Sequence, residues 1–145
     1  MEKNLNVKTI ADYVNEGKEP EVLFWVGCAG SFDDRAKKIT KAFVKILNSI
    51  NVDFAVLGTE ESCTGDPAKR SGNEFLFQMQ AMTNIEVLNS YDIKTIVTTC
   101  PHCFNTIKNE YPSLGGKYKV LHCLLYTSDA ADDTPCVDLG GRRII

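Results

Sequence analysis

The chain has 145 residues, 43% of them hydrophobic and 9% aromatic, and its 16 Lys and Arg against 19 Asp and Glu give a net charge of −3. This composition is typical of a soluble globular domain and argues against collagen, coiled-coil and disordered chains. The sequence has no apolar run near the roughly 20 residues that cross a bilayer, no signal-peptide stretch at its start, and no Lys/Arg cluster that would attract nucleic acid. We therefore expect a cytoplasmic protein without membrane insertion or nucleic-acid binding.

The first predicted elements are a lead-in segment, residues 1–20, and a buried strand. Within the lead-in, residues 7–16 (VKTIADYVNE) favour a short helix that Gly17 ends. Residues 21–26 (EVLFWV) are mostly large or β-branched and apolar, which predicts a strand buried on both faces. A loop is expected at residues 28–32.

Two amphipathic helices and a second strand follow. Asp33 and Asp34 suit the start of a helix whose apolar residues recur at steps of three and four, namely Ile39, Ala42, Phe43, Ile46, Leu47 and Ile50. Residues 53–57 (DFAVL) predict the second strand, and residues 59–72 a loop. The next helix is predicted at about residues 73–90, with one apolar face formed by Phe75, Met79, Met82, Ile85 and Leu88.

The third predicted strand, residues 94–98 (KTIVT), runs directly into a Cys-Pro-His-Cys motif. Because Pro101 suits the first position of a helix, Cys100 would be its N-cap and Cys103 would lie in its first turn, and Pro112 would end the helix after about Glu110. Residues 117–121 predict a fourth strand. This alternation predicts a three-layer, Rossmann-like α/β domain with a mainly parallel sheet at residues 21–122, truncated at its C-terminus.

The last segment, residues 123–145, shows no helical or strand period. Back-translated with permitted codons, its blocks 123–133 and 137–145 look like the two constant parts of a transposase-based sequencing adapter, with the place of a sample index between them. We therefore interpret residues 123–145 as translated adapter rather than native sequence. Of the six cysteines, four then remain, at positions 28, 63, 100 and 103.

Each of these four cysteines follows a predicted strand. Cys28 comes after the first strand, Cys63 after the second, and Cys100 and Cys103 after the third. Since parallel strands point the same way, all four are expected at the carboxyl edge of the sheet, where open α/β sheets bind ligands. Thiols in the cytosol stay reduced, so the pattern indicates metal ligation or redox chemistry rather than disulfides.

Three kinds of site fit the four thiols. An iron–sulfur cluster takes four thiolates and tolerates ligands dispersed along the chain. A structural zinc site would also use four, although its ligands usually come as two close pairs. A dithiol redox centre would need only Cys100 and Cys103, whose pKa values a helix start lowers, and it would leave the other two unexplained. The residues alone favour the cluster and leave zinc and dithiol chemistry open.

The long motif segments are more specific than the cysteine count. The spacing Cys28-x34-Cys63-Thr64-Gly65-x34-Cys100-x2-Cys103, with SCTGDPAKRSGNE around the second cysteine and TTCPHCFNTIKNEYP around the last two, resembles the cysteine-rich CCG domain. This domain occurs in a subunit of heterodisulfide reductase, in the iron–sulfur subunit of glycolate oxidase and in related (Fe-S)-binding oxidoreductases. The resemblance covers about residues 22–122.

The resemblance implies an electron-transfer module with one cluster, not a complete enzyme. It implies that the ligands are Cys28, Cys63, Cys100 and Cys103. It also implies that a second cluster-binding domain of the same parent chain is missing here. The implied partners are a flavoprotein or other iron–sulfur subunits, and any association with a membrane would be through such a partner. The family pattern has a second cysteine where this chain has Thr64. Four ligands instead of five indicate a [4Fe-4S] cluster in one-electron relay and place direct disulfide reduction in doubt.

Several neighbours of the cysteines are candidates to tune such a cluster. His102 lies between two ligands and is placed to hydrogen-bond a cluster sulfur, although a solvent-facing role needs no function. Arg70 follows Lys69 and would offset the negative charge of the cluster or simply start a solvated helix. Glycines let backbone pass close to the cluster, or form ordinary turns, at Gly27, Gly30 and Gly65. Trp25, Phe24 and the helical methionines are expected in the core.

Overall fold

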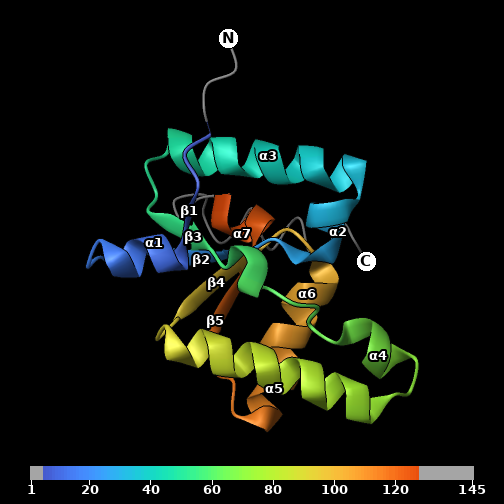
Figure 1. Cartoon of the computed structure of the whole chain (residues 1–145). Coiled ribbons are helices and arrows are strands. Elements are labelled where there is room, and N and C mark those ends of the chain that lie inside the picture. The colour runs from blue at the N-terminus through green and yellow to red at the C-terminus, as the bar shows by residue number, and fades with distance from the viewer. Residues whose placement is uncertain (1–4, 128–145) are drawn as a thin grey trace, which may run out of the picture.

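The computed structural model describes residues 5–127, which form a parallel five-stranded sheet between two layers of helices (Figure 1). In chain order the strands are β1 (Lys8–Thr9), β2 (Val22–Trp25), β3 (Phe54–Val56), β4 (Thr95–Thr98) and β5 (Lys119–His122). Their order across the sheet is β1-β3-β2-β4-β5, and every pair is parallel. The predicted α/β class with a parallel sheet is confirmed, and all four predicted strands are present.

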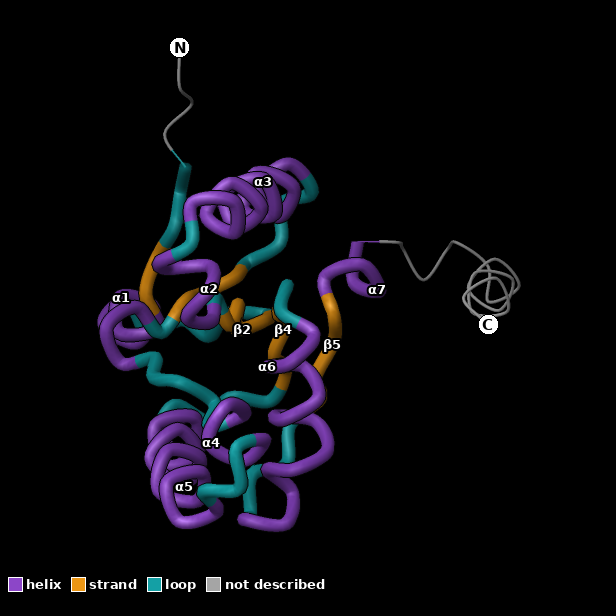
Figure 2. The backbone as a smooth tube through the Cα atoms, turned by 90° about the vertical axis from the view of Figure 1, so that its right-hand side faces the viewer, coloured by secondary structure: helices purple, strands orange, loops and turns teal. Residues whose placement is uncertain are grey.

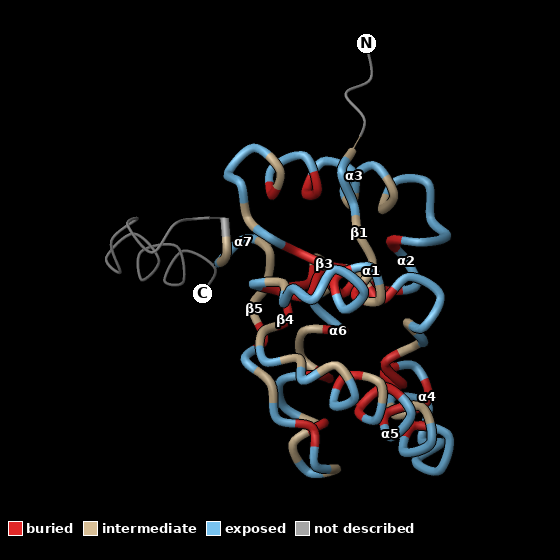
Figure 3. Tube along the Cα trace, turned by 60° about the vertical axis from the view of Figure 1, so that its left-hand side comes forward, coloured by how far each residue is buried: buried red, intermediate tan, exposed pale blue. Residues whose placement is uncertain are grey.

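The centre of the sheet is apolar on both faces. All four residues of β2 are buried, and Leu23 pairs with Ala55 of β3 on one side and Ile96 of β4 on the other. Figure 3 shows the buried residues concentrated in the sheet and on the helix surfaces that face it. A parallel sheet covered on both faces has no solvent side, and this explains why its strands are continuous apolar runs.

Helices α3 (Asp34–Ser49) and α5 (Glu74–Ser90) cover opposite faces of the sheet (Figure 2). Asp33 caps α3 by accepting a hydrogen bond from the Ala36 N–H at 2.7 Å, and Asn73 caps α5 in the same way. On the α3 side, Phe43 packs edge-on against Phe24 of β2 with ring centroids 5.0 Å apart. Both helices therefore begin where their capping residues predict.

The core faces of the two helices differ from the prediction. In α5 the buried residues are Phe77, Ala81, Asn84, Ile85 and Leu88, whereas Phe75, Met79 and Met82 are 75%, 53% and 53% exposed. In α3, Phe43, Val44 and Leu47 are buried, and Ile39, Ile46 and Ile50 are exposed. The assignment of the methionines of α5 to the core is wrong, because a helix that is apolar on several sides does not show from its period which side faces the sheet.

Short elements appear where a longer helix or a loop was expected. Thr9 and Asp12 form a capping box, so the chain extends as β1 before α1 (Ile10–Asn15) begins. The expected loop after β2 is the short helix α2 (Gly27–Phe32), which Asp33 ends by taking an extended conformation. The loop after β3 contains a 3₁₀ turn (Gly58–Glu60) and α4 (Asp66–Arg70).

The helix after β4 changes its winding along its length. It starts as α6 (Pro101–Asn105), continues as a π-helical turn (Thr106–Glu110) and closes as a 3₁₀ turn (Tyr111–Leu114). Pro112 therefore does not stop the helical path, since it lies at the first turn of the 3₁₀ segment, where its missing N–H costs nothing.

The segment interpreted as adapter lies mostly outside the described residues. Its first five residues form α7 (Cys123–Thr127) after β5, and residues 128–145 are not described. The foreign origin of the segment stays a prediction. None of the helices within residues 5–127 combines the length and the apolar composition that a membrane span requires.

Candidate metal centre

The four cysteines lie at the carboxyl edge of the sheet, where the strand order reverses. From β2 the chain moves to β3 on one side, and it then returns across β2 to β4 on the other side. Doubly wound sheets bind ligands at such a switch point, because the loops after the two neighbouring strands separate there and leave a crevice. Cys28 follows β2, while Cys100 and Cys103 follow β4, so the pair and the single cysteine lie on the two sides of this switch point.

The Cys100–Cys103 pair begins α6. Cys100 is the N-cap with extended backbone, and Pro101 is the first helical residue, as predicted. A hydrogen bond from the Cys103 thiol, together with the N–H groups of Cys103 and His102, lowers the pKa of Cys100 to about 5. The same interaction, with burial, raises the pKa of Cys103. The pair is therefore one thiolate and one thiol that donates to it, and the thiolate is the form that binds metal.

Gly27, the first residue of α2, lies against the Cys103 thiol. Its φ of +78° is a left-handed value that side chains rarely adopt, and a Cβ placed on it would lie 3.4 Å from Cys103 Sγ. The Thr64 hydroxyl also reaches Cys103 and lowers the pKa of its thiol by hydrogen bonding. Thr64 is 3% exposed, so its side chain is buried beside Cys103.

A buried polar network holds the segment that carries Cys63. The Asn84 amide donates to the Cys63 carbonyl at 2.8 Å and to the Tyr111 hydroxyl at 3.1 Å, and it accepts from Ser62 Oγ at 2.8 Å. The Tyr111 hydroxyl in turn donates to the Thr64 carbonyl at 3.0 Å. Burial raises the pKa of Tyr111, which keeps this donor protonated. The network joins α5 and the end of the α6 helical path to the Cys63 loop.

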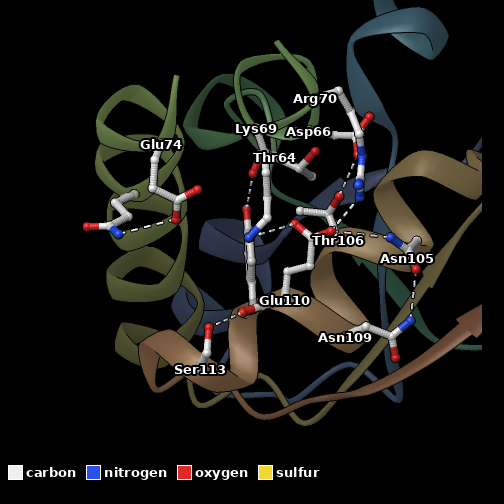
Figure 4. Close-up of polar contacts among 12 residues, drawn as sticks. Thr64, Asp66, Lys69, Arg70, Glu74, Asn105, Thr106, Asn109, Glu110 and Ser113 are labelled. Atoms are coloured by element: carbon white, nitrogen blue, oxygen red, sulfur yellow. Dashed lines mark hydrogen bonds and ion pairs between the residues drawn. The ribbon is translucent and has the colours of Figure 1, made fainter. Parts of the chain in front are cut away.

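Ion pairs tie the same loop to α6 (Figure 4). Asp66, buried at the start of α4, accepts from Arg70 Nε and from Thr106 Oγ1, both at 3.2 Å. Its other carboxylate oxygen lies 3.3 Å from His102 Nδ1. Glu110 pairs with Arg70 and, at 3.6 Å, with Lys69. The predicted roles of Arg70 and His102 toward a cluster stay predictions, since the contacts of both side chains here are with carboxylates.

Glu61 joins the Cys63 loop to the Cys28 helix. Its carboxylate accepts hydrogen bonds from the Val26 N–H at 3.0 Å and the Gly27 N–H at 2.6 Å. Burial raises the pKa of Glu61 to about 7, although both N–H groups favour the charged form. No sequence pattern marks Glu61, because hydrogen bonds across 34 and 35 positions leave no period.

The remaining predicted residues lie beside the site rather than in it. Gly65 has a φ of +90°, and its Cα faces α5, where a Cβ would lie 2.8 Å from the Phe77 ring. Gly30 packs against Thr40 of α3. These contacts explain both glycines by close packing of backbone against a helix.

The structure brings the four thiols to one edge without closing them on one point. Cys103 is buried, Cys63 and Cys100 are half-buried, and Cys28 is exposed but close enough for its charge to raise the pKa of Cys103. Across residues 5–127, no three Cys, His, Asp or Glu side chains are grouped as ligands of a single metal ion. A cluster offers several iron atoms instead of one, so its thiolates do not have to converge on a point.

The donor set and the backbone fit an iron–sulfur cluster. Four thiols come from three adjacent strand ends, hydrogen bonds lower the pKa of one of them, Cys100, and the Gly27 backbone passes closely beside the buried Cys103. Bound here, a cluster would take its thiolates from Cys28, Cys63, Cys100 and Cys103.

Comparisons with known proteins agree with this chemistry. The family described as CCG, cysteine-rich domain, matches residues 22–108. The chain is 47% identical over 122 residues to the EtfAB:quinone oxidoreductase of Syntrophomonas wolfei, which covers 81% of this chain and 17% of that protein. It is 48% identical over 116 residues to the probable iron-sulfur-binding oxidoreductase FadF of Bacillus subtilis, covering 80% of this chain and 16% of that protein.

A more distant relative belongs to a heterodisulfide reductase. One subunit of the dihydromethanophenazine:CoB–CoM heterodisulfide reductase of Methanosarcina barkeri is 28% identical over 115 residues, covering 75% of this chain and 28% of that protein. The chain thus spans about a sixth of the first two relatives and little more than a quarter of the third. No solved structure matches it.

Proposed function

The chain belongs to the CCG family of cysteine-rich domains, and we propose that it binds one [4Fe-4S] cluster and passes electrons one at a time. The observation that carries this proposal is the thiolate–thiol pair of Cys100 and Cys103 at the switch point, with Cys28 and Cys63 on the two neighbouring strand ends. A bound cluster would accept and release single electrons. The names of two relatives, which include iron-sulfur binding and quinone oxidoreductase, support the same class of reaction.

The protein's own residues prepare the site for thiolate ligation. The α6 N-terminus and the Cys103 thiol hold Cys100 ionised, so one ligand needs no deprotonation. The Thr64 hydroxyl and the Gly27 backbone surround Cys103 and keep water from its sulfur. Hydrogen bonds to the sulfurs raise the potential of a cluster, because they stabilise the more negative reduced state.

Electrons are proposed to enter and leave on the Cys28 side. Cys28 is the exposed ligand, whereas Cys103 is buried beneath the sheet edge. A partner that docks over α2 would therefore come nearest to the cluster. We propose as partners a second cluster-binding domain of the parent chain and a flavoprotein or iron–sulfur subunit, with any contact to a membrane made through them.

Dithiol exchange is the second candidate, and one observation favours it. Cys100 is a thiolate at neutral pH in contact with the Cys103 thiol, which is the arrangement of a redox-active pair at a helix start. This chemistry needs neither Cys28 nor Cys63. Disulfide reduction that survives Cys28→Ser and Cys63→Ser would support it, and loss of activity with either variant would contradict it.

Anaerobic reconstitution with iron and sulfide tests the proposed function. We expect about four irons and four sulfides per chain with broad visible absorption, and loss of both in Cys63→Ser. A structural zinc site would instead bind zinc without visible absorption. Zinc retained in preference to iron under the same conditions would contradict the cluster.

A further inference from the structure

Helix α2 carries Cys28 but has no cap of its own. Its N-cap residue, Val26, makes no side-chain capping bond. The first N–H groups of any helix have no partner within it and need one from elsewhere. Here the N–H groups of Val26 and Gly27 both find the Glu61 carboxylate, at 3.0 and 2.6 Å.

Glu61 therefore acts on two single cysteines at once. It stands two positions before Cys63, and its carboxylate fixes the backbone one position before Cys28. Each carboxylate oxygen serves one N–H group, so neither bond can be lost without freeing part of the α2 start. The residue is half-buried, and none of the ion pairs among residues 5–127 involves it.

The Cys28 side has few other connections to the site. The Ser31 hydroxyl donates back to the Gly27 carbonyl within α2, and Gly30 packs against α3, which lies away from the Cys100–Cys103 pair. The Cys63 loop, in contrast, is also tied to α5 and α6 by Asn84, Tyr111 and Asp66. Among residues 5–127, the hydrogen bonds of Glu61 connect α2 to this fixed loop, while the contact of Gly27 with Cys103 connects α2 to α6.

We propose that Glu61 is a positioning residue that sets Cys28 at the correct distance from Cys63 for cluster ligation. The inference rests on the proposed function only for the identity of the ligand, because the tie between α2 and the Cys63 loop exists without a cluster. Loss of the tie would loosen the corner that Cys28 holds and leave the other three thiols in place.

The test compares Glu61→Gln with Glu60→Gln. Both replace a carboxyl group by an amide at neighbouring positions, but Glu60 is exposed and accepts its hydrogen bond from the Tyr91 hydroxyl instead of from α2. In the metal-free protein, amide hydrogen exchange at Val26 and Gly27 is expected to rise roughly tenfold in Glu61→Gln and to stay unchanged in Glu60→Gln. Unchanged exchange at both amides in a folded Glu61→Gln protein would overturn the inference.

A second readout uses the reconstituted protein. One-electron oxidation by ferricyanide makes a [4Fe-4S] cluster release one Fe²⁺ at its most weakly held corner, which leaves a three-iron cluster with its own electron paramagnetic resonance signal. We expect this signal to form severalfold faster in Glu61→Gln than in wild type or Glu60→Gln. Equal rates in all three proteins would contradict the positioning role. If wild type binds no iron, the proposed function fails while the amide exchange still decides whether Glu61 fixes α2.

Discussion

The two sides of the candidate site are built differently. On one side, Cys63, Cys100 and Cys103 are half-buried or buried, and the loop and helix that carry them are joined by Asn84, Tyr111 and Asp66. On the other, Cys28 is exposed on a helix of six residues, which is hydrogen-bonded to the Cys63 loop by the Glu61 carboxylate and whose first residue, Gly27, lies against Cys103. A buried hydrogen-bond network with all its partners fixes the positions of its residues more firmly than the two hydrogen bonds of one carboxylate do.

This difference suggests a division of labour between the two sides. The buried side sets the positions of three thiols and lowers the pKa of one, while the Cys28 side is exposed on the surface where we propose that a partner docks. Residues 61–70 serve both sides, since Glu61 reaches α2 and Asp66 reaches the α6 path. A substitution that disturbs one side should therefore also have a measurable effect on the other side.

Asn84→Ala should disrupt the hydrogen-bond network of the buried side and cause the largest loss of stability. It would leave the Cys63 carbonyl without its donor and the Tyr111 hydroxyl without one of its two hydrogen bonds, and unsatisfied buried groups cost roughly 1–3 kcal/mol each, so we expect about 3 kcal/mol less stability. Urea unfolding measures the loss. Thr83→Ala, on the exposed side of the same helix turn, is the control. Equal losses of stability in both variants would show that the Asn84 network does not stabilise the fold.

Gly27→Ala tests the contact between the two sides. Alanine at a left-handed φ costs about 1–2 kcal/mol, and here its methyl would also meet Cys103. Gly72 is the matched control, because its φ of +86° carries the same strain with nothing within 4 Å. Both alanine variants should lose similar stability in urea, but only Gly27→Ala should lose iron on reconstitution. Full iron content in Gly27→Ala would argue that the close contact between residue 27 and Cys103 does not affect cluster binding.

Thr64→Val should lower the reduction potential of the cluster without changing the geometry of the buried side. Valine keeps the shape of threonine but removes the hydroxyl that faces Cys103. A hydrogen bond worth about 1 kcal/mol can favour the reduced state by at most that amount, which is roughly 40 mV for a one-electron couple, so the reduction potential should fall by up to about 40 mV. Thr64→Ser should keep the wild-type potential. Equal potentials in all three proteins would mean that the hydroxyl does not act on the cluster.

Met79→Gln should have the smallest effect on stability. Met79 lies on the exposed side of α5, away from the stripe that carries Asn84, and surface substitutions usually change stability by less than about 0.5 kcal/mol. Thermal unfolding with wild type alongside checks this. A loss near that of Asn84→Ala would mean that the buried stripe of α5 has been assigned to the wrong side.

The sequence predicts the sheet and the placement of the cysteines better than it predicts their support. Strands such as residues 21–26 are identified because a strand buried on both faces must be apolar throughout, and the carboxyl end of each strand then places its cysteine. The stripe of α5 could not be chosen, because Phe75 and Met79 are as apolar as Phe77 and Ala81 and only the sheet decides between them. Glu61 and Tyr111 act across 34 to 47 positions, and such contacts exist only once the chain has folded.

Iron content across a set of single Cys→Ser variants tests the ligand assignment most directly. Cys123 is the matched control, because it also follows a parallel strand of the sheet, β5, but belongs to none of the three proposed ligand loops. After anaerobic reconstitution, wild type and Cys123→Ser should each hold about four irons per chain, and the variants at Cys28, Cys63, Cys100 and Cys103 should each hold far less. Full iron in any one of those four variants, or its loss in Cys123→Ser, would contradict the assignment.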